Sequence, residues 1–344
     1  MANYETLNKG EWSEVFALLR TLSDGILKGC NARLEHQIND TIPFIYLKHT
    51  AVNGSDIHYH IENENIKIIS QTDTTMISRS SLNSAANTVF EKIINSSNRT
   101  FRIIEIDNIL EEMQYPRLKS PTASKSDLII ALVENSQAIE RGFSVKSNLG
   151  ANTSLVNASK ATNFLFEISS VKSEWLSLKA KKLVANIPIE NIRFLGMDNT
   201  TYHHNLQLID LQLPQIIAFM LIHYFRGLST RISDLLAEIT RQNPLSLSNT
   251  DLYRAKIEDF LVSSALGMVP TQEWNRLHSA DGGMMIVKEN REVVTFYCIN
   301  AQSMTYFRQY LIENCYLDTA STTRHGFGRV YDDNKLKLNL LIRL

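Results

Sequence analysis

The sequence is poor in the features that mark secreted and membrane proteins. It has only three cysteines, an odd number without metal-ligand spacing, so we expect a reduced, cytoplasmic protein without a disulfide framework. The N-terminus carries Glu5, Lys9 and Glu11 where a secretory signal peptide would be apolar, and we expect no such signal. The longest apolar run, Ile216–Ile222, is far too short to cross a bilayer, so no membrane contact is expected.

The chain also lacks a strong excess of either charge. Its net charge is −1, so the total alone does not indicate a nucleic-acid-binding protein. The charges are unevenly distributed, because residues 1–115 hold 10 Lys and Arg against 15 Asp and Glu, whereas residues 116–344 hold 25 against 21. Since the phosphate field is screened within about 8–10 Å, a neutral protein can still bind DNA through basic groups that lie together. The asymmetry permits DNA binding without requiring it.

What is present is an ordinary globular composition, with 44% hydrophobic and 21% charged residues in 344. This length suits one large domain or two modest ones. An amphipathic helix near the N-terminus is predicted by apolar residues at helical spacing, namely Trp12, Val15, Phe16, Leu19 and Leu22. Glu11 and Glu14 stand in its first turn, where carboxylates complement the helix dipole, and this is the ordinary explanation for both.

We expect three regions along the chain, 1–115, 116–200 and 201–344. The first contains strands within 40–80, with a turn at Asn53-Gly54, and helices over 83–95 and 105–113. The last is mainly helical over 205–266, followed by a hairpin from Gly283 to Tyr297, a helix over 301–313 and a terminal strand over 335–343.

The middle region begins with the clearest loop in the chain, Tyr115–Lys125. Leu128–Val133, Phe143–Val145 and Phe164–Ile168 predict three neighbouring strands, before a helix over 174–187 and a strand over 192–196. These elements predict a compact α/β core.

Three polar residues interrupt the strands of this core. Asp127 opens the first strand, and Ser144 and Lys146 lie two apart on the second, so they face the same side. If the strands pair antiparallel, all three meet at one edge of the sheet. Asp127 and the backbone carbonyl of Val145 are then candidate ligands for Mg²⁺, and Lys146 could orient or deprotonate an attacking water in phosphodiester hydrolysis. A turn aspartate and a solvated edge lysine are the more common explanation of this spacing.

An aspartate followed by (Asp/Glu)-x-Lys on the next strand, with a glutamate-bearing helix upstream, resembles the PD-(D/E)XK nucleases. Further stretches are similar to the HpaII family of type II restriction endonucleases, and they lie at the start, middle and end of the chain. They are Asn8-Lys-Gly-Glu-Trp-Ser-Glu14, Gly142-Phe-Ser-Val-Lys-Ser-Asn-Leu-Gly150 with Leu155-Val-Asn-Ala-Ser159 and Thr162-Asn-Phe164, and Asp318-Thr-Ala-Ser-Thr-Thr-Arg-His-Gly-Phe-Gly328 with Leu338-Asn-Leu-Leu-Ile-Arg343.

The resemblance implies a mixed central sheet flanked by helices in the PD-(D/E)XK manner, plus a largely helical C-terminal portion. It implies that residues 1–115 carry the first active-site helix, that residues 116–200 form the catalytic core, and that residues 201–344 serve DNA recognition, dimerisation or both. It also implies Mg²⁺-dependent, sequence-specific cleavage of double-stranded DNA with 5′-phosphate ends, at a site associated with CCGG. Asp127 and Lys146 match the motif residues, and Glu14, or Glu11 one turn away, matches the helix carboxylate. A palindromic target favours a homodimer, and a restriction enzyme implies a companion DNA methyltransferase.

The sequence departs from the motif at position 144, where Ser stands in place of Asp or Glu. The site therefore has one carboxylate fewer, which makes Glu14 more important, and Glu140 is a conceivable substitute, expected in a turn. Two other functions stay open: another nuclease of the same fold, and a DNA-binding protein that has lost cleavage.

Two polar segments are candidates for reading the DNA sequence. Asn152, Asn157 and Lys160 follow the second strand, and a plain polar surface loop explains them about equally well. Arg324 has the side chain best shaped for guanine, with His325 beside it in a glycine-bearing loop, although such a pair is more often plain surface or an internal ion pair. Basic residues nearby are candidates for flanking the DNA backbone, namely Lys172, Lys179, Lys181, Lys182 and Arg193.

Overall fold

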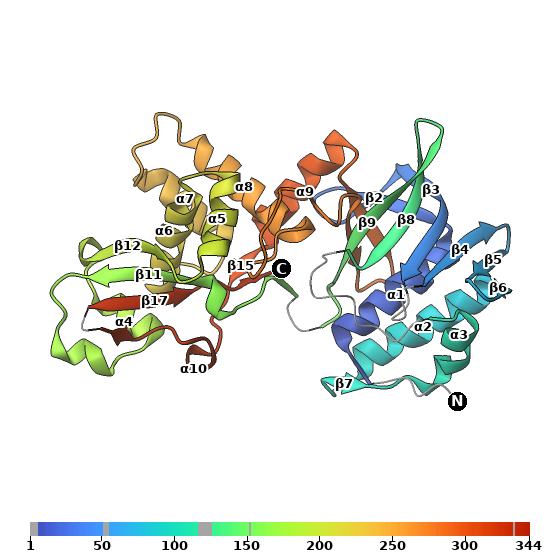
Figure 1. Ribbon diagram of the computed structural model, residues 1–344, viewed down its shortest axis with the longest axis horizontal. Helices are drawn as coiled ribbons and strands as arrows, with labels where there is room; N and C mark the ends of the chain where they lie inside the picture. Colours follow the sequence, from blue (N-terminus) through green and yellow to red (C-terminus); the bar gives the residue numbers. More distant parts are fainter. Residues whose placement is uncertain (1–5, 51–54, 116–125, 151–152, 333) are drawn as a thin grey trace. The chain divides into compact units, whose positions relative to one another are not determined.

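The computed structural model describes residues 6–50, 55–115, 126–150, 153–332 and 334–344 (Figure 1). The chain forms two compact units, one of residues 1–153 with 278–307 and one of residues 154–277 with 308–344. The expected mixed α/β class is confirmed. The unit boundaries do not coincide with the three regions expected from the sequence, whose functional division stays a prediction. The difference arises because the hairpin after residue 278 pairs with a strand of the first unit.

The first unit is built around a nine-stranded sheet in the order β2-β14-β13-β9-β8-β3-β4-β5-β6. β9 pairs antiparallel with β8 and parallel with β13. Because β2 pairs with both β3 and β14, six of these strands close into a ring of pairings. The strands are β2 (Ile26–Cys30), β3 (His36–Thr50), β4 (Asp56–Glu62), β5 (Asn65–Ile69), β6 (Thr74–Ser78), β8 (Leu128–Glu134), β9 (Gln137–Ser147), β13 (Gly283–Val287) and β14 (Val293–Tyr297).

Helices α1 (Lys9–Asp24) and α2 (Arg79–Asn95) pack side by side against one face of this sheet (Figure 1). The apolar face of α1 predicted from the sequence is buried, and its Phe16 ring lies 5.5 Å from the Phe90 ring of α2. Burying rings of this size supplies much of the apolar area that stabilises a core. The remaining elements are η1 (Ile104–Ile106), α3 (Asp107–Glu112) and the paired short strands β1 (Leu7–Asn8) and β7 (Thr100–Phe101).

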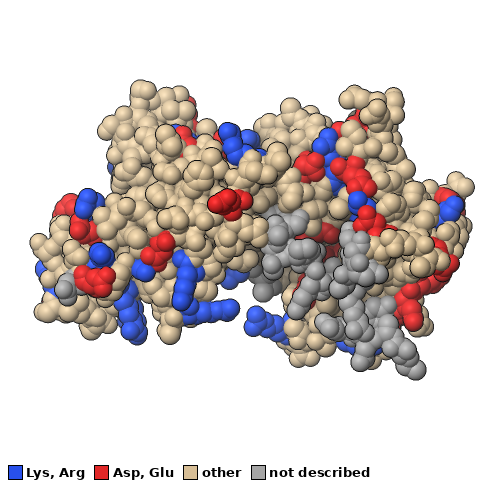
Figure 2. Space-filling model, viewed as in Figure 1, with Lys and Arg blue, Asp and Glu red and all other residues tan. Residues whose placement is uncertain are grey.

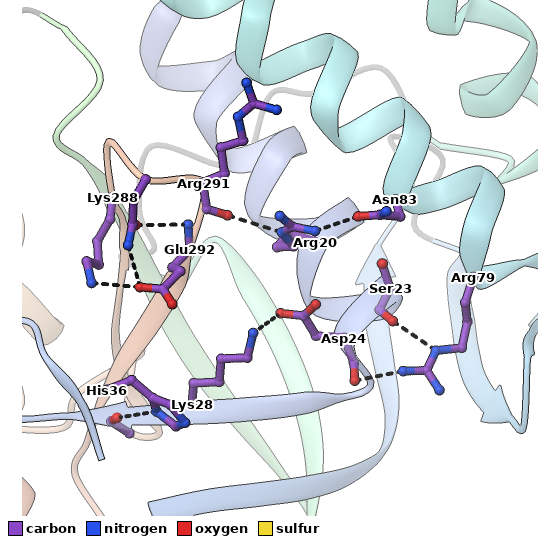
Figure 3. A network of polar contacts seen from close by, with 12 residues as sticks. Arg20, Ser23, Asp24, Lys28, His36, Arg79, Asn83, Lys288, Arg291 and Glu292 are labelled. Atoms are coloured by element: carbon purple, nitrogen blue, oxygen red, sulfur yellow. Dashed lines mark hydrogen bonds and ion pairs between the residues drawn. The ribbon is translucent and has the colours of Figure 1, made fainter. Parts of the chain in front are cut away.

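A polar network anchors the C-terminal half of α1, as Figure 3 shows. The Arg79 guanidinium donates to the carbonyls of Ser23 (2.9 Å) and Asp24 (2.7 Å), which have no partner within the helix. Arg20 donates to the Arg291 carbonyl at 3.1 Å and to Asn83 Oδ1 at 2.5 Å. α1 is therefore fixed to α2 and to the β13–β14 turn, so the helix that carries Glu14 has a defined position against the sheet.

The second unit contains two small sheets and most of the helices (Figure 1). Its four-stranded sheet has the order β12-β11-β17-β16 and its three-stranded sheet the order β10-β18-β15. The strands are β10 (Ser154–Val156), β11 (Asn163–Ile168), β12 (Ile192–Met197), β15 (Tyr316–Leu317), β16 (Val330–Tyr331), β17 (Lys335–Asn339) and β18 (Ile342–Arg343). The helical elements are η2 (Lys160–Thr162), η3 (Ser173–Ser177), α4 (Ala180–Asn186), η4 (Ile189–Asn191), α5 (Thr200–Ile209), α6 (Leu213–Phe225), α7 (Ile232–Gln242), α8 (Asp251–Leu266) and α10 (Thr322–His325), while α9 (Ala301–Asn314) contains the unit boundary.

Several expected elements are confirmed, among them the N-terminal helix, the first two core strands, the helices within 205–266 and the β13–β14 hairpin. The Asn53-Gly54 turn lies outside the described residues. Among the described residues, no single helix is long and apolar enough to cross a membrane. α5 and α6 reach the necessary length and apolar composition only when taken together, and the pair is bent by 108°.

Three expectations about the middle and end of the chain are wrong. The strand at Phe164 belongs to the second unit and pairs with β12 and β17, while β13 takes the place beside β9. The helix expected over 174–187 is split into η3 and α4, because the Ala180 amide donates to the Gly328 carbonyl (2.7 Å) instead of continuing a helix. The terminal strand is likewise split into β17 and β18, because the Leu340 amide bonds the Thr162 carbonyl at 2.9 Å.

Candidate active site

The β8–β9 hairpin sets the position of Asp127. Leu128 lies opposite Phe143, and the Asp127 amide donates to the Phe143 carbonyl at 2.9 Å. The side chain then turns toward β9, where Oδ2 accepts from the Val145 amide at 2.6 Å and from the Ser144 hydroxyl at 3.4 Å. The antiparallel pairing predicted from the sequence is confirmed, and it places the aspartate beside the next strand.

Side chains alternate along β9 as the sequence pattern predicts. Phe143 and Val145 are buried in the core shared with α1. Ser144 and Lys146 therefore project from the opposite face, where Ser144 is fully buried and Lys146 half-buried. Lys146 Nζ donates to the Val145 carbonyl at 3.0 Å, so the ammonium turns toward the same stretch of backbone that binds Asp127.

The two glutamates of α1 have different roles. Glu11 forms a capping box with Asn8, accepting from the Asn8 amide at 2.7 Å while Asn8 Oδ1 accepts from the Glu11 amide at 3.0 Å. Glu14 lies one turn further on, near Asp127 and Lys146. Burial, reinforced by the negative charge of Asp127 and opposed by Lys146, raises the pKa of Glu14 to about 8. The structure therefore favours Glu14 over Glu11 as the helix carboxylate of this cluster.

Two residues not singled out from the sequence also belong to the site. Ser13 is buried beside Glu14, and its hydroxyl lies 2.9 Å from the hydroxyl of Ser147, the residue after Lys146. Tyr115 is also buried, and its pKa is raised, first by burial and then by Glu14. Its phenol therefore stays protonated near the two carboxylates. Neither residue follows a spacing rule, because both reach the site through tertiary packing.

The donor set suits a hard cation held by few protein ligands. Among the described residues no group of three or more His, Cys, Asp and Glu side chains could hold a metal ion. Mg²⁺ commonly takes one or two carboxylates and completes its octahedron with water and substrate phosphate oxygens. Glu14, Asp127 and the Val145 carbonyl fit that pattern, whereas Ser144 adds no charge.

Glu140 is not a substitute for the missing acid. It lies in β9 rather than in the turn, which is made by Asn135 and Ser136 with positive φ. Its carboxylate accepts from the Tyr46 hydroxyl at 2.9 Å and pairs with the Lys48 ammonium. The negative charge of Glu140 is thereby balanced by Lys48 on the surface of the sheet.

The candidate DNA-reading residues lie in the second unit, apart from Asn152, which is outside the described residues. Asn157 and Lys160 are exposed between β10 and β11. Arg324 is exposed and His325 half-buried on α10, between the Ser321 N-cap and Gly326, whose φ of 66° suits glycine. The pKa of His325 is lowered by burial and by neighbouring Arg324.

Comparison with known proteins agrees with the motifs. The sequence matches the HpaII restriction endonuclease family over residues 8–344. It is also similar to the type II restriction enzyme HpaII of Haemophilus parainfluenzae, with 33% identity over 360 aligned positions that cover 100% of this chain and 99% of the relative. No solved structure matches the chain. The match spans nearly the whole sequence, so the chain belongs to the HpaII restriction endonuclease family.

Proposed function

We propose that this restriction endonuclease hydrolyses both strands of duplex DNA with Mg²⁺, on a core of the PD-(D/E)XK type, and leaves 5′-phosphate and 3′-hydroxyl ends. The observation that carries the proposal is the convergence of Glu14, Asp127 and Lys146 in one unit, where burial first, and then the charges of Asp127 and Lys146, shift the pKa of Glu14. Perturbed carboxylates beside a lysine are typical of catalytic sites.

In the proposed mechanism, Glu14, Asp127 and the Val145 carbonyl hold the cation. When bound, Mg²⁺ neutralises phosphate charge and makes water more acidic. The Val145 amide fixes one oxygen of Asp127 at 2.6 Å, which leaves Oδ1 for the cation. As the ammonium, Lys146 orients the attacking water and offsets the charge on the phosphate, and the proton of the water passes to solvent; as the neutral amine, it takes that proton itself. The water oxygen bonds to phosphorus, the bond from phosphorus to the 3′ oxygen breaks, and this oxygen takes a proton from solvent to give the 3′-hydroxyl end.

Ser144 gives the site a different charge balance from the general motif. Its hydroxyl donates to Asp127 at 3.4 Å, so it orients that carboxylate weakly and adds no negative charge. With two acids in place of three, we propose that each site holds one Mg²⁺.

The second unit supplies the proposed DNA contacts. Asn157, Lys160, Arg324 and His325 are proposed to face the bases. Four other exposed cations on α4 and the segments beside it have no ion-pair partner among the described residues, namely Lys179, Lys181, Lys182 and Arg329. Figure 2 shows Lys and Arg side chains projecting from the edge of this unit where Figure 1 draws α4 and α10. Unpaired cations of this kind displace counterions from phosphates.

One of the basic candidates suits this role less well, because Arg193 is paired with Glu167 at 2.7 Å. Lys172 and Lys181 lie over aromatic rings, at 5.4 Å from Trp175 and 4.3 Å from Tyr224, and both stay free of carboxylates among the described residues. The proposed phosphate surface is therefore centred on α4 and the segment after α10.

The site CCGG, a homodimer, a cytoplasmic location and a companion methyltransferase complete the proposal. A palindromic site suits a two-fold dimer, because each subunit then presents one active site to one strand.

The proposal is tested by digesting a sequenced plasmid with Mg²⁺ and with EDTA, and by sequencing the ends of the fragments. Discrete fragments only with Mg²⁺ support the reaction, and their ends identify the site. An intact plasmid with every divalent ion, while the protein still retards the DNA, would instead favour the non-cleaving function that the serine at 144 suggests. Fragments cut at another sequence would retain the nuclease and reject CCGG.

A further inference from the structure

Two loops of the second unit carry the proposed base contacts. The first loop is residues 157–162, between β10 and β11, and the second loop is residues 321–328, which includes α10. They are about 160 residues apart in sequence, yet both stand on the same end of the β11–β17 ladder, where Asn163 lies opposite Asn339.

Buried side chains join the two loops at this point. Thr162, Asn163 and Asn339 are each at most 2% exposed. Asn339 Nδ2 lies 2.7 Å from the Ser159 carbonyl and 2.7 Å from Asn163 Oδ1, and 3.1 Å from Thr162 Oγ1. Asn163 Nδ2 then donates to the His325 carbonyl at 3.0 Å. A continuous chain of amide hydrogen bonds therefore runs from the backbone of the first loop to that of the second.

Each loop is also held from within. Ser159 and Thr162 form a capping box at η2, directly beside exposed Lys160. In the second loop, Ser321 caps α10, and the Gly328 amide donates to the Lys337 carbonyl of β17 at 2.8 Å. Each loop therefore has hydrogen bonds of its own, and the bond from Asn163 to the His325 carbonyl joins the two loops directly.

Buried amides are costly to leave unpaired, so they hold their partners at one geometry. The joint therefore sets the spacing of the two loops. Reading base edges requires a set spacing, because a displacement of about 1 Å removes a bidentate contact. The exposed side chains beside the joint are those that can make such contacts, Lys160 on one loop and Arg324 on the other.

We propose that Asn163 and Asn339 are positioning residues for sequence recognition, which lock the two loops into a single base-reading element. The inference rests on the proposed function, since it supposes a DNA site to be read. It assigns the choice of sequence to the second unit and to a joint that touches no base itself.

The test uses the full-length protein with Asn163→Asp. Aspartate keeps the oxygen that accepts from Asn339, but it replaces the donor to the His325 carbonyl with an acceptor and pushes the second loop away. Asn243→Asp is the matched control, because Asn243 Nδ2 also donates to a backbone carbonyl, that of Leu247, at 3.0 Å in the same unit. Ser159→Ala is a milder second variant, which removes the hydroxyl cap that fixes the backbone at Ser159, whose carbonyl accepts from Asn339.

The readout is discrimination rather than activity. Binding to DNA duplexes is measured in Ca²⁺ and in EDTA. One duplex carries the sequence that the protein cuts in the plasmid, and the other duplexes differ from it by one base pair. We expect Asn163→Asp and Ser159→Ala to reduce the preference for the cut sequence, about tenfold for Asn163→Asp, with unchanged affinity for unrelated DNA. Asn243→Asp should keep the full preference.

If the unaltered protein discriminates and Asn163→Asp and Ser159→Ala discriminate equally well, the inference is overturned and the proposed function stands. The inference would also be overturned if Asn243→Asp lost the preference for the cut sequence, since weakening any loop of this unit would then be enough to reduce discrimination. If Asn163→Asp does not fold, Ser159→Ala decides by the same comparison. A wild-type protein that does not discriminate removes both the proposed function and the inference.

Discussion

The hydroxyls of Ser13 and Ser147 lie 2.9 Å apart and join α1 to β9 next to Glu14 and Lys146. Ser13 Oγ also lies 2.8 Å from the Lys9 carbonyl, one turn back. The pair therefore sets how far the helix carboxylate stands from the strand that carries the lysine.

We expect Ser13→Ala to raise the Mg²⁺ concentration needed for half-maximal cleavage several-fold, because Glu14 loses a fixed position. The stability loss should be about 1 kcal/mol, the usual value of one hydrogen bond. Ser84→Ala is the control, since Ser84 makes the same contact to a carbonyl one turn back (3.0 Å) on α2 without a partner across the core among the described residues. Equal Mg²⁺ dependence in both variants, measured by initial rates, would show that Ser13 is only structural.

The raised pKa of Glu14 predicts how stability depends on pH without metal. Its ordinary value is 4.5 and its folded value is about 8, so between these pH values the unfolded chain releases a proton that the folded protein keeps. The stability linked to Glu14 is therefore complete below about pH 4.5 and is lost as the pH rises to 8.

Glu14→Gln should consequently stabilise the metal-free protein above pH 8, by about 1–3 kcal/mol, and have little effect at pH 4. Melting temperatures in EDTA from pH 4 to 9 measure this difference. Glu11→Gln is the control, because glutamine also serves in a capping box and leaves Glu14 in place. A Glu14→Gln curve parallel to that of the wild type would contradict the account.

Ser144→Ala should reduce cleavage less than tenfold. The hydroxyl contributes only a 3.4 Å contact to Asp127, whose stronger bond comes from the Val145 amide. Ser144→Asp should lower the metal-free melting temperature, because a third carboxylate adds repulsion, and Mg²⁺ should restore part of the loss. Loss of cleavage in Ser144→Ala to the extent seen for Asp127 variants would show that the serine has a direct chemical role.

The proposed phosphate surface is tested by salt dependence. Replacing Lys181 and Lys182 by alanine should make the plot of log affinity against log salt less steep by about one unit for each lost phosphate contact. Arg254→Ala serves as the control, because Arg254 is already paired with Glu258 at 2.8 Å on α8. An unchanged slope in the double variant would place the backbone contacts elsewhere.

The hairpin that holds Asp127 and Lys146 could be predicted because its pattern is local. Alternation fixed which side chains share a face, and the motif indicated which strands pair. The choice between Glu11 and Glu14 could not be made from spacing, since both stand in the first turns of the same helix. The structure separates them, because Glu11 binds Asn8 whereas Glu14 is buried near Asp127 and Lys146.

The errors concern long-range pairing. Phe164–Ile168 is apolar and follows the hairpin, so adjacency favoured the same sheet, but its partner strands come from residues 192–197 and 335–339. The strand that lies beside β9 is β13, which begins at Gly283. Asn163 and Asn339 stood in quoted motifs, yet their joint depends on a register between segments 176 residues apart, which no local rule supplies.

The central claim, that Asp127 holds the cation for cleavage, is tested most directly by Asp127→Asn in single-turnover cleavage with Mg²⁺. The amide oxygen can still accept from the Val145 amide, so the fold is kept while the charge is lost. Asp73→Asn is the control, an exposed aspartate that also accepts from a backbone amide, at 2.8 Å. The account predicts that Asp127→Asn binds the duplex and cuts it about 10²–10³-fold more slowly or not at all, whereas Asp73→Asn cuts normally. Cleavage by Asp127→Asn at close to the wild-type rate would contradict it.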